Sequence, residues 1–297
     1  MNLFAKILVT LRNLANHPLH RNAKAKAVID FCLVQVAVRL VPGDICVPFP
    51  NDTKLLISPR MKGAAHFIRP GLCEFEEMCF VLHFLRADDL FIDIGANVGA
   101  YTILASGAVG ARTLAFEPSP FSFRYLVQNV RLNDLGAKAT PLNLALGSAE
   151  GVLHLTEGLG TENYVSPTGA SASTTQVRVT TLDTALAGLH PAVIKLDVEG
   201  FEHEVIEGAG AVFANPSVSA LIVERMGNAV RYGYDEAALH HRIQQQAFIP
   251  CAYQPFQRVL SRLPADAQGN LIYVRDVQAA QERLRNSPTF SFADATI

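Results

Sequence analysis

The stretch that decides the fold is residues 90–102, which read LFIDIGANVGAYT. An apolar strand-like segment contains Asp93, a turn follows through Gly95, Asn97 and Gly99, and a helical pattern begins at residue 100. Glycines at such a turn permit positive φ and let backbone N–H groups approach a ligand closely. The Gly-x-x-x-Gly spacing differs from the G-x-G-x-x-G of dinucleotide-binding folds. A carboxylate at the start of the turn suits a ligand with a cationic amino group.

Two further acidic residues follow apolar strands in the same way. Residues 113–120 read TLAFEPSP, so the second strand ends at Glu117, at about the spacing, roughly 20 residues, of the acid that binds a ribose diol in nucleotide-binding α/β folds. Residues 193–200 read VIKLDVEG, so a later strand ends at Asp197, followed by Glu199 and Gly200. Because the carboxyl ends of parallel strands meet at one edge of a sheet, we expect Asp93, Glu117 and Asp197 to face one pocket.

Apolar strand-like segments alternate with helical ones on both sides of this stretch, which is typical of α/β proteins with a mostly parallel sheet and helices on both faces. The predicted strands cover residues 90–94, 113–116, 139–144, 177–179, 192–196, 218–223, 248–253 and 271–274, with an extra edge strand at 151–155. The predicted helices cover residues 74–86, 100–108, 121–133, 201–208 and 235–246, followed by a tail past 276 that is helical and then frayed.

The flanking segments predict three parts of the chain. They are an N-terminal extension of residues 1–70, a main domain of residues 71–277 and a C-terminal tail of residues 278–297. Residues 1–41 have the apolar spacing of one or two amphipathic helices, and Pro42-Gly43 breaks that pattern. Proline-punctuated residues 44–70, with Pro59 and Pro70, indicate a small β element or lid. The basic amphipathic start is compatible with a membrane surface, but we favour packing against the main domain or a partner subunit. Homo-oligomerisation through these helices is one hypothesis.

Residues 156–176 are rich in Gly, Ser and Thr and lack periodicity, so we expect a long loop over or beside the site. Hydrophobic residues make up 49% and charged residues 18% of the 297, and the formal net charge is −2. This near-neutral balance, with no tryptophan, argues against a nucleic-acid partner. No apolar run reaches the roughly 20 residues of a transmembrane helix. The five scattered cysteines predict reduced, mostly core thiols and a cytoplasmic location.

Five motifs follow one another within residues 74–225, namely DIGANVGAYT, AFEPSPFSF, LNLALGSAEG, TLDTAL and IKLDVEGFEHEVIEGA. Taken in this order, they resemble the FkbM-type methyltransferase family. The resemblance implies a class I methyltransferase (Rossmann-like) fold with a seven-stranded sheet. It also implies S-adenosylmethionine as cofactor and O-methylation of a hydroxyl on a sugar or small secondary metabolite. The acceptor would thus be a small molecule or a saccharide.

The resemblance also implies roles for individual residues. Asp93, Gly95, Asn97 and Gly99 would hold the methionine part of the cofactor, and Glu117 its ribose. Asn143 and Ala145 would lie near the adenine, Asp197 and Glu199 near the transferring methyl group, and Glu76 beside the cofactor.

Transfer to a neutral hydroxyl gains from a base, and Asp197, Glu199 and His203 are the candidates because they follow the fourth strand of the core. His203 is the weaker candidate, since on its helix it can simply face water. Lys195 is either a buried charge paired with an acid or an edge residue with its amine in solvent. Glu224-Arg225, at the end of the fifth strand of the core, either lines the acceptor side or forms an ordinary surface ion pair.

We predict no metal, because the acids near the pocket lack a second cluster at ligand spacing and the adjacent His240 and His241 cannot share a helix face. One alternative is a nicotinamide-dependent oxidoreductase, which the glycine spacing disfavours. Another is a non-catalytic binding module that kept the fold. The third alternative is a methyltransferase that acts on nucleic acid.

Overall fold

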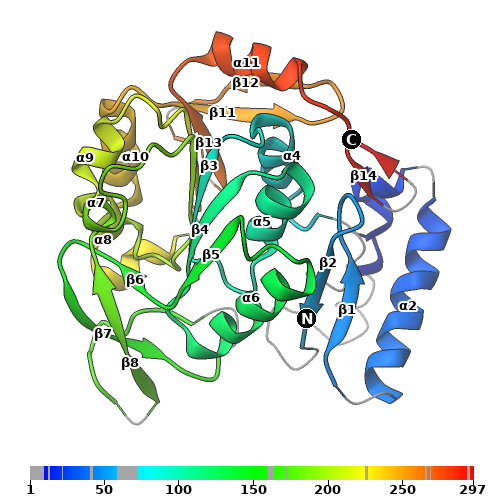
Figure 1. Ribbon diagram of the computed structural model, residues 1–297, viewed down its shortest axis with the longest axis horizontal. Coiled ribbons are helices and arrows are strands. Elements are labelled where there is room, and N and C mark those ends of the chain that lie inside the picture. Colours follow the sequence, from blue (N-terminus) through cyan, green and yellow to red (C-terminus); the bar gives the residue numbers. More distant parts are fainter. Residues whose placement is uncertain are drawn as a thin grey trace.

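The computed structural model describes residues 10–12, 14–21, 23–40, 43–58, 72–159, 163–171, 173–224, 227–264, 266–267, 269–292 and 295–297. Its centre is an eight-stranded sheet with the order β12-β11-β13-β10-β9-β3-β4-β5 (Figure 1). The strands are β3 (Leu90–Ile94), β4 (Arg112–Phe116), β5 (Ala139–Leu142), β9 (Val193–Leu196), β10 (Ala220–Val223), β11 (Ile249–Gln254), β12 (Val259–Arg262) and β13 (Leu271–Val274). The predicted α/β class is confirmed.

The strands from β10 to β5 run parallel, whereas β13, β11 and β12 pair antiparallel. The family resemblance implied a sheet of seven strands. The eighth strand is β12, which forms a hairpin with β11 at the edge of the sheet. From β3 the chain adds β4 and β5 on one side and then returns to place β9 on the other side. Where the strand order reverses in this way, a crevice opens at the carboxyl ends of the strands.

Side chains of β3 alternate between two apolar cores, one on each face of the sheet. Phe91 belongs to the first core, while Leu90, Ile92 and Ile94 belong to the second. The strand is buried throughout, as expected for a central parallel strand covered by helices on both sides. This double burial explains why its sequence is apolar rather than alternating.

The two helical layers are separate in Figure 1. The first core is covered by α4 (Phe75–Phe84), α5 (Ala100–Ile103), the π-helical turn η2 (Leu104–Val109), α6 (Pro120–Leu132) and α11 (Val277–Arg285). The second is covered by α7 (Leu182–Ala185), α8 (Glu202–Glu207), α9 (Gly210–Ala214) and α10 (Glu236–Gln245). The single helix predicted for residues 100–108 is wrong in its second half, where the π-helical turn contains Gly107, a residue that weakens regular helix.

A smaller sheet stands apart from the main one. It has the order β6-β8-β7 and consists of β6 (Ala145–Leu146), β7 (Gly151–Thr156) and β8 (Thr174–Thr180). The prediction that residues 151–155 form an edge strand of the main sheet is therefore wrong. The seven-residue β8 gives β7 an antiparallel partner along its whole length, and Leu155, Val177 and Val179 close a small core of their own.

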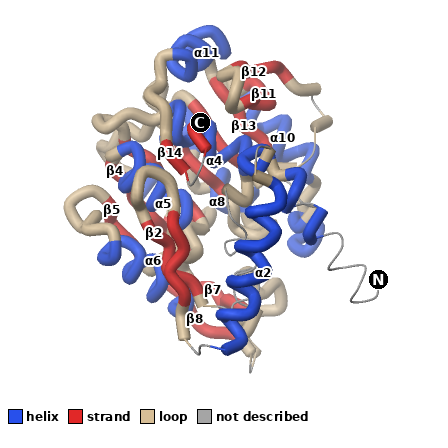
Figure 2. Tube along the Cα trace, turned by 90° about the vertical axis from the view of Figure 1, so that its right-hand side faces the viewer, coloured by secondary structure: helices blue, strands red, loops and turns tan. Residues whose placement is uncertain are grey.

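The N-terminal extension contains η1 (Pro18–His20), α2 (Lys24–Leu40) and a hairpin of β1 (Ile45–Pro48) and β2 (Lys54–Ile57). The helix α2 runs along the outside of the molecule (Figures 1 and 2), with Ala27 buried and Val34 against the core. Asn129 ties the hairpin to α6, because its amide bonds both the N–H and the carbonyl of Leu56. The predicted β element is confirmed for residues 45–57, and the prolines at 42, 59 and 70 lie outside the described residues.

The cysteine prediction is partly wrong. All five thiols are free, but only Cys79 and Cys251 are buried, while Cys32, Cys46 and Cys73 are exposed. Cys32 lies on the outer helix α2 and Cys46 on the N-terminal hairpin, where half of the side chains face solvent. Within the described ranges, no helix combines the length and the apolarity needed to cross a membrane.

The C-terminal residues form part of the main core. After α11 the chain makes a short hairpin of β14 (Ser291–Phe292) and β15 (Ala295–Thr296), so the expectation of a frayed tail is wrong. Phe290, Phe292 and Ile297 are buried in the first core, and the Phe292 ring lies edge-on to Phe49 with centroids 6.4 Å apart. The tail thereby connects the N-terminal hairpin to α4 and α11.

We expect Phe292→Ala to lower the free energy of unfolding by about 3 kcal/mol, because it leaves a cavity between the two terminal segments. Urea denaturation measures the change. The control is Phe121→Ala, since Phe121 is 41% exposed and should cost less than about 1 kcal/mol. Equal effects of the two variants would show that the tail contributes no more than a surface residue.

Candidate active site

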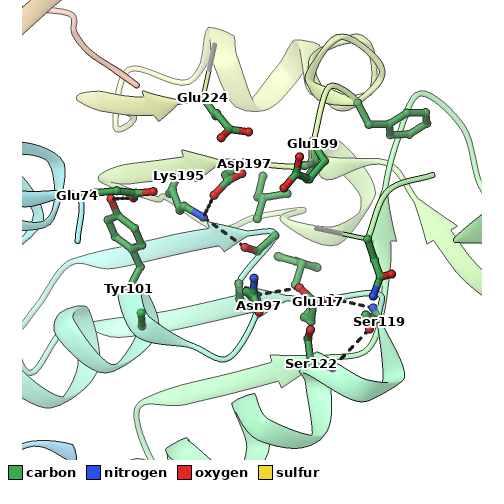
Figure 3. A pocket seen from close by; sticks show the side chains of 18 of the residues that line it. Glu74, Asn97, Tyr101, Glu117, Ser119, Ser122, Lys195, Asp197, Glu199 and Glu224 are labelled. Atoms are coloured by element: carbon green, nitrogen blue, oxygen red, sulfur yellow. Dashed lines mark hydrogen bonds and ion pairs between the residues drawn. The ribbon is translucent and has the colours of Figure 1, made fainter. Parts of the chain in front are cut away.

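A cavity of about 1020 Å³ lies where the carboxyl ends of β3, β4, β9 and β10 meet. Its walls include the turns after these four strands, the start of α4, and residues 144–146, 163–165 and 228. Figure 3 shows acidic side chains from several of these elements pointing toward a common centre. Of the residues predicted for the site, Glu76, Gly95, Asn97, Glu117, Ala145, Asp197 and Glu199 line this cavity.

The first wall is the turn after β3, which depends on Gly95. This residue has φ +73°, and a Cβ built on it would lie 1.8 Å from the backbone oxygen of Asp197. Any other residue would therefore clash with the turn after β9. Asn97 also has a positive φ of 53°, and its backbone N–H points to Glu117, with N and Oε2 2.8 Å apart.

Asp93 and Gly99 lie beneath this turn and do not line the cavity. Asp93 is fully buried and accepts a hydrogen bond from the Thr102 hydroxyl at 2.6 Å. Burial raises the pKa of its carboxyl, and the ammonium of Lys195 lowers it in part. Gly99 is the N-cap of α5 and packs against Leu126. Both residues thus support the turn from the protein side.

Glu117 is held at the end of β4 by two backbone N–H groups. Asn97 N donates to Oε2 and Ser119 N to Oε1, each at 2.8 Å. A carboxylate oxygen has two lone pairs, so each oxygen can accept a second hydrogen bond from a ligand. Burial raises the pKa of Glu117 to about 7, against the two N–H bonds that lower it.

The strand β5 ends at Leu142 rather than at the predicted residue 144, so both Asn143 and Ala145 follow it, and only Ala145 lines the cavity. The Asn143 amide donates to the carbonyl oxygens of Glu117 at 2.9 Å and Pro118 at 3.0 Å. Asn143 therefore positions the backbone that carries Glu117.

Lys195 is the buried cation at the centre of the site. It lies on β9, between β3 and β10, so the alternative of an edge residue with its amine in solvent is wrong. Its ammonium donates to Asp197 Oδ2 at 2.8 Å and to the Gly95 carbonyl at 3.3 Å. It also lies 5.1 Å from the centre of the Tyr101 ring. Although burial lowers the pKa of Lys195, Asp197, Asp93 and Glu74 together raise it above its ordinary value.

Glu74 and Tyr101 were not singled out from the sequence. The Tyr101 hydroxyl donates to Glu74 Oε2, and burial raises the pKa of the Glu74 carboxyl. Glu74 precedes α4 and Tyr101 belongs to α5, so a contact between separate elements brings them together. Glu76, which was predicted, lines the cavity from the first turn of α4.

The turn after β9 presents Asp197 and Glu199 to the cavity. Glu202, which the sequence reasoning missed, holds this turn from below, since its Oε1 accepts from Val198 N at 3.0 Å and Gly200 N at 3.2 Å. Glu199 has a positive φ of 56°, and its Oε2 accepts from the Asn228 amide at 3.1 Å. The unusual backbone of Glu199 directs its side chain toward the acids around Lys195 (Figure 3).

Glu224 extends the cavity at the end of β10 and hydrogen-bonds the side chain of Asp197. Burial, followed by the negative charges of Asp197 and Glu199, raises the pKa of Glu224 to about 9. Glu224 therefore carries a proton at neutral pH and can donate it to the Asp197 carboxylate. It is a cavity residue rather than an ordinary surface acid, whereas Arg225 lies outside the described residues.

His203 is not among the residues that line the cavity. Its ring stacks on Tyr234 with centroids 4.1 Å apart. His240 is buried on α10 and contacts the Tyr273 hydroxyl at 2.7 Å. Within the described part of the chain, no three His, Cys, Asp or Glu side chains form a group that could hold a metal ion.

Part of the predicted long loop crosses the cavity. Tyr164 and Val165 line it, and Val165 pairs with Leu155 of β7. The Tyr232 hydroxyl donates to the Val165 carbonyl at 2.8 Å, and the Arg231 guanidinium lies 3.7 Å from the centre of the Tyr164 ring. These contacts hold residues 163–165 against the segment η4 (Asn228–Tyr232).

We expect Lys195→Met to lower the free energy of unfolding by about 3–5 kcal/mol, because it leaves the buried acids without their cation. Lys195 lowers the pKa of Asp93 and Glu74, so its loss should raise both. An acid whose pKa is raised in the folded state destabilises the protein at pH values where it would have to ionise. The loss of stability in Lys195→Met should therefore be larger at pH 8 than at pH 5.

Urea denaturation at the two pH values measures this effect. The control is Lys26→Met, which breaks an exposed ion pair with Asp30 and should cost less than about 1 kcal/mol at both pH values. If Lys195→Met matched this control, Lys195 would not be the cation that stabilises the acidic cluster.

Comparison with known proteins shows which family this chain is similar to. Residues 93–249 match the methyltransferase FkbM domain. The hexuronic acid methyltransferase AglP of Haloferax volcanii is 30% identical over 166 residues, which cover 55% of this chain and 63% of that protein. The methyltransferase sdnD of Sordaria araneosa is 32% identical over 83 residues, which cover 28% of this chain and 32% of that one. The chain thus spans less than two thirds of these curated relatives.

Among solved structures, the methyltransferase FkbM from Methylobacillus flagellatus aligns with 15% identity and a TM-score of 0.45, covering 91% of this chain and 59% of that one. The family match begins at Asp93 and extends past Glu117, Asp197 and Glu224, so it contains the turns after β3, β4, β9 and β10 that build the cavity. It covers more than half of the chain. The chain belongs to the FkbM methyltransferase family.

Proposed function

We propose that this protein is an S-adenosylmethionine-dependent methyltransferase that O-methylates a hydroxyl group of a sugar or another small metabolite. The observation that carries the proposal is the arrangement of Glu117, which lines the cavity with both oxygens oriented by backbone N–H groups. A carboxylate held in this way is a suitable acceptor for the two hydroxyls of a ribose.

The rest of the cavity fits the same cofactor. The tight turn at Gly95 and Asn97 provides backbone groups next to Glu117. Glu74 and Asp197 supply negative charge for a ligand with an ammonium group and a sulfonium. Ala145 and Phe116 offer apolar surface for a purine ring. S-adenosylmethionine supplies an activated methyl group, so the protein's main task is to align donor and acceptor.

Within this proposal, Glu199 is the general base that takes the proton of the acceptor hydroxyl. The Asp197 carboxylate already accepts a hydrogen bond from the Lys195 ammonium, with Oδ2 and Nζ 2.8 Å apart. Glu199 lines the cavity at the turn after β9, and its Oε2 accepts a hydrogen bond from the Asn228 amide. Asp197 then acts through its charge, and His203, which lies away from the cavity, takes no part.

The first experiment is calorimetric titration with S-adenosylmethionine, S-adenosylhomocysteine and NAD in parallel. We expect the first two to bind and NAD not to bind, because the turn after β3 lacks the glycine spacing of a dinucleotide site. Binding of NAD alone, or of no ligand, would overturn the proposal.

The pKa of Glu117, about 7, predicts that binding of S-adenosylhomocysteine releases a proton near neutral pH. The folded-state pKa lies above the ordinary value, so the carboxyl is partly protonated at pH 7, while accepting two ribose hydroxyls requires the ionised form. Affinity should therefore fall as the pH is lowered through 7. Calorimetry in buffers of different ionisation enthalpy measures the proton. The Glu117→Gln variant should bind S-adenosylhomocysteine about tenfold or more weakly and should release no proton on binding. An unchanged proton release would contradict the ribose assignment.

For the base, we expect Glu199→Gln to lower kcat by about 10²–10⁴-fold with any acceptor that the protein methylates. S-adenosylhomocysteine affinity should stay nearly unchanged, because the backbone groups that hold Glu117 belong to Asn97 and Ser119. Single-turnover methyl transfer and calorimetry measure the two quantities. The matched comparison is Asp197→Asn, which should weaken cofactor binding as well. A Glu199→Gln variant with parental kcat would exclude Glu199 as the base.

A further inference from the structure

The small sheet β6-β8-β7 is a structural unit of its own beside the main sheet (Figure 1). Its core is separate from the two cores of the main sheet. Residues 164–166 lie along its outer strand β7, where Val165 pairs with Leu155. The Tyr164 carbonyl also accepts a hydrogen bond from Thr156 N at 2.9 Å. We call the small sheet together with residues 164–166 the flap.

The flap forms one side of the cavity. It begins at Ala145, the first residue of β6, which lines the cavity at the proposed purine position. Tyr164 and Val165, on its outer strand, line the same cavity where it meets η4. A cofactor bound at Glu117 could therefore not leave on this side while the flap stays in place.

The base of the flap is attached tightly to the main domain. Gly147, directly after β6, donates its N–H to the Thr180 carbonyl at 3.0 Å. A Cβ built on Gly208, at the end of α8, would lie 2.1 Å from the backbone oxygen of Gly147. The backbones of the flap base and of α8 thus touch, which makes this end the fixed end of the flap.

The segment η4 is fixed in the same way to the turn after β9. The Asn228 amide donates to Glu199 Oε2 at 3.1 Å, and Arg231 Nη1 donates to the Glu199 carbonyl at 2.9 Å. A Cβ built on Gly200 would lie 2.5 Å from the backbone oxygen of Asn228. Because η4 lies directly on this turn, it offers the flap a rigid surface to close against.

Two side chains of η4 hold the outer end of the flap. The Arg231 guanidinium lies 3.7 Å from the centre of the Tyr164 ring, and the Tyr232 hydroxyl donates to the Val165 carbonyl at 2.8 Å. All four residues are partly exposed. A cation–π contact and a single hydrogen bond between such groups are individually weak. The outer end is therefore held by contacts that can break while the base stays attached.

We propose that the flap opens and closes to control the exchange of the cofactor, and that Arg231 is the positioning residue that holds it closed. The inference rests on the proposed function and adds a conformational step to the same site. One guanidinium contacts both the flap, at Tyr164, and the turn that carries Glu199. Closing of the flap and placement of Glu199 are thereby linked.

The test measures the association and dissociation rate constants of S-adenosylhomocysteine with the whole chain, by surface plasmon resonance. Arg231→Met should raise both rate constants about tenfold, because losing the cation–π contact and the hydrogen bond to Glu199 makes opening more frequent. Since the ligand enters and leaves through the same opening, Kd should change less than either rate constant. A residue that only shapes the binding surface would change the dissociation rate constant alone.

Two further variants make the test specific. Arg124→Met is the matched control, because Arg124 lies 5.1 Å from the centre of the Tyr125 ring but outside the cavity lining. It makes the same change in net charge and should leave both rate constants unchanged. Tyr232→Phe removes only the hydroxyl that bonds Val165 and should raise both rate constants about threefold. This second variant keeps the test decisive if Arg231→Met does not fold.

The remaining outcomes separate the flap from the proposed function. Unchanged rate constants in the Arg231 and Tyr232 variants, or a rise in the dissociation rate constant alone, would overturn the inference. An equal effect of Arg124→Met would overturn it as well. Failure of the parent protein to bind S-adenosylhomocysteine would instead overturn the proposed function.

Discussion

The buried ammonium of Lys195 is the interaction on which the site depends. It contacts the carboxylate of Asp197 and the carbonyl of Gly95, and thereby joins the turns after β9 and β3. The same two turns touch at the missing Cβ of Gly95. A lysine in the middle of a central strand is costly to bury, and here Asp93, Asp197 and Glu74 stabilise its charge. In return, the lysine allows several carboxyl groups to share one small volume.

The pairing of Lys195 with several carboxyl groups explains how so many acidic residues can line one cavity. Burial and mutual repulsion raise the pKa values of Glu74, Glu117 and Glu224. Each is anchored by hydrogen bonds from a different element, namely Tyr101 on α5, the turn after β3, and Asp197 after β9. The acids therefore cannot move apart to relieve the repulsion. The cationic cofactor that we propose would lower the electrostatic cost of this arrangement.

The core of the fold was predictable because its signals are local. The strands β3, β4 and β9 are short apolar runs that end at or next to an acid, and a strand buried on both faces has this composition wherever it occurs. Glycines at the first turn and at Gly200 mark the positive φ angles that the turns require. Glu117 and Asp197 could accordingly be assigned to one pocket from their positions at strand ends. Elements whose partners are distant in the sequence were less predictable, such as the pairing of β7 with β8 and the C-terminal hairpin.

The sequence by itself determined the α/β class, the family, and the residues that follow the central strands, since each depends on residue type and spacing along the chain. The tertiary structure alone decided that Lys195 is central and paired, that Glu74, Tyr101 and Glu224 join the cavity, and that His203 does not. The physical reason is that burial and charge pairing are properties of residues brought together from separate elements. A residue's neighbours along the chain do not reveal which charges will surround it in the folded protein.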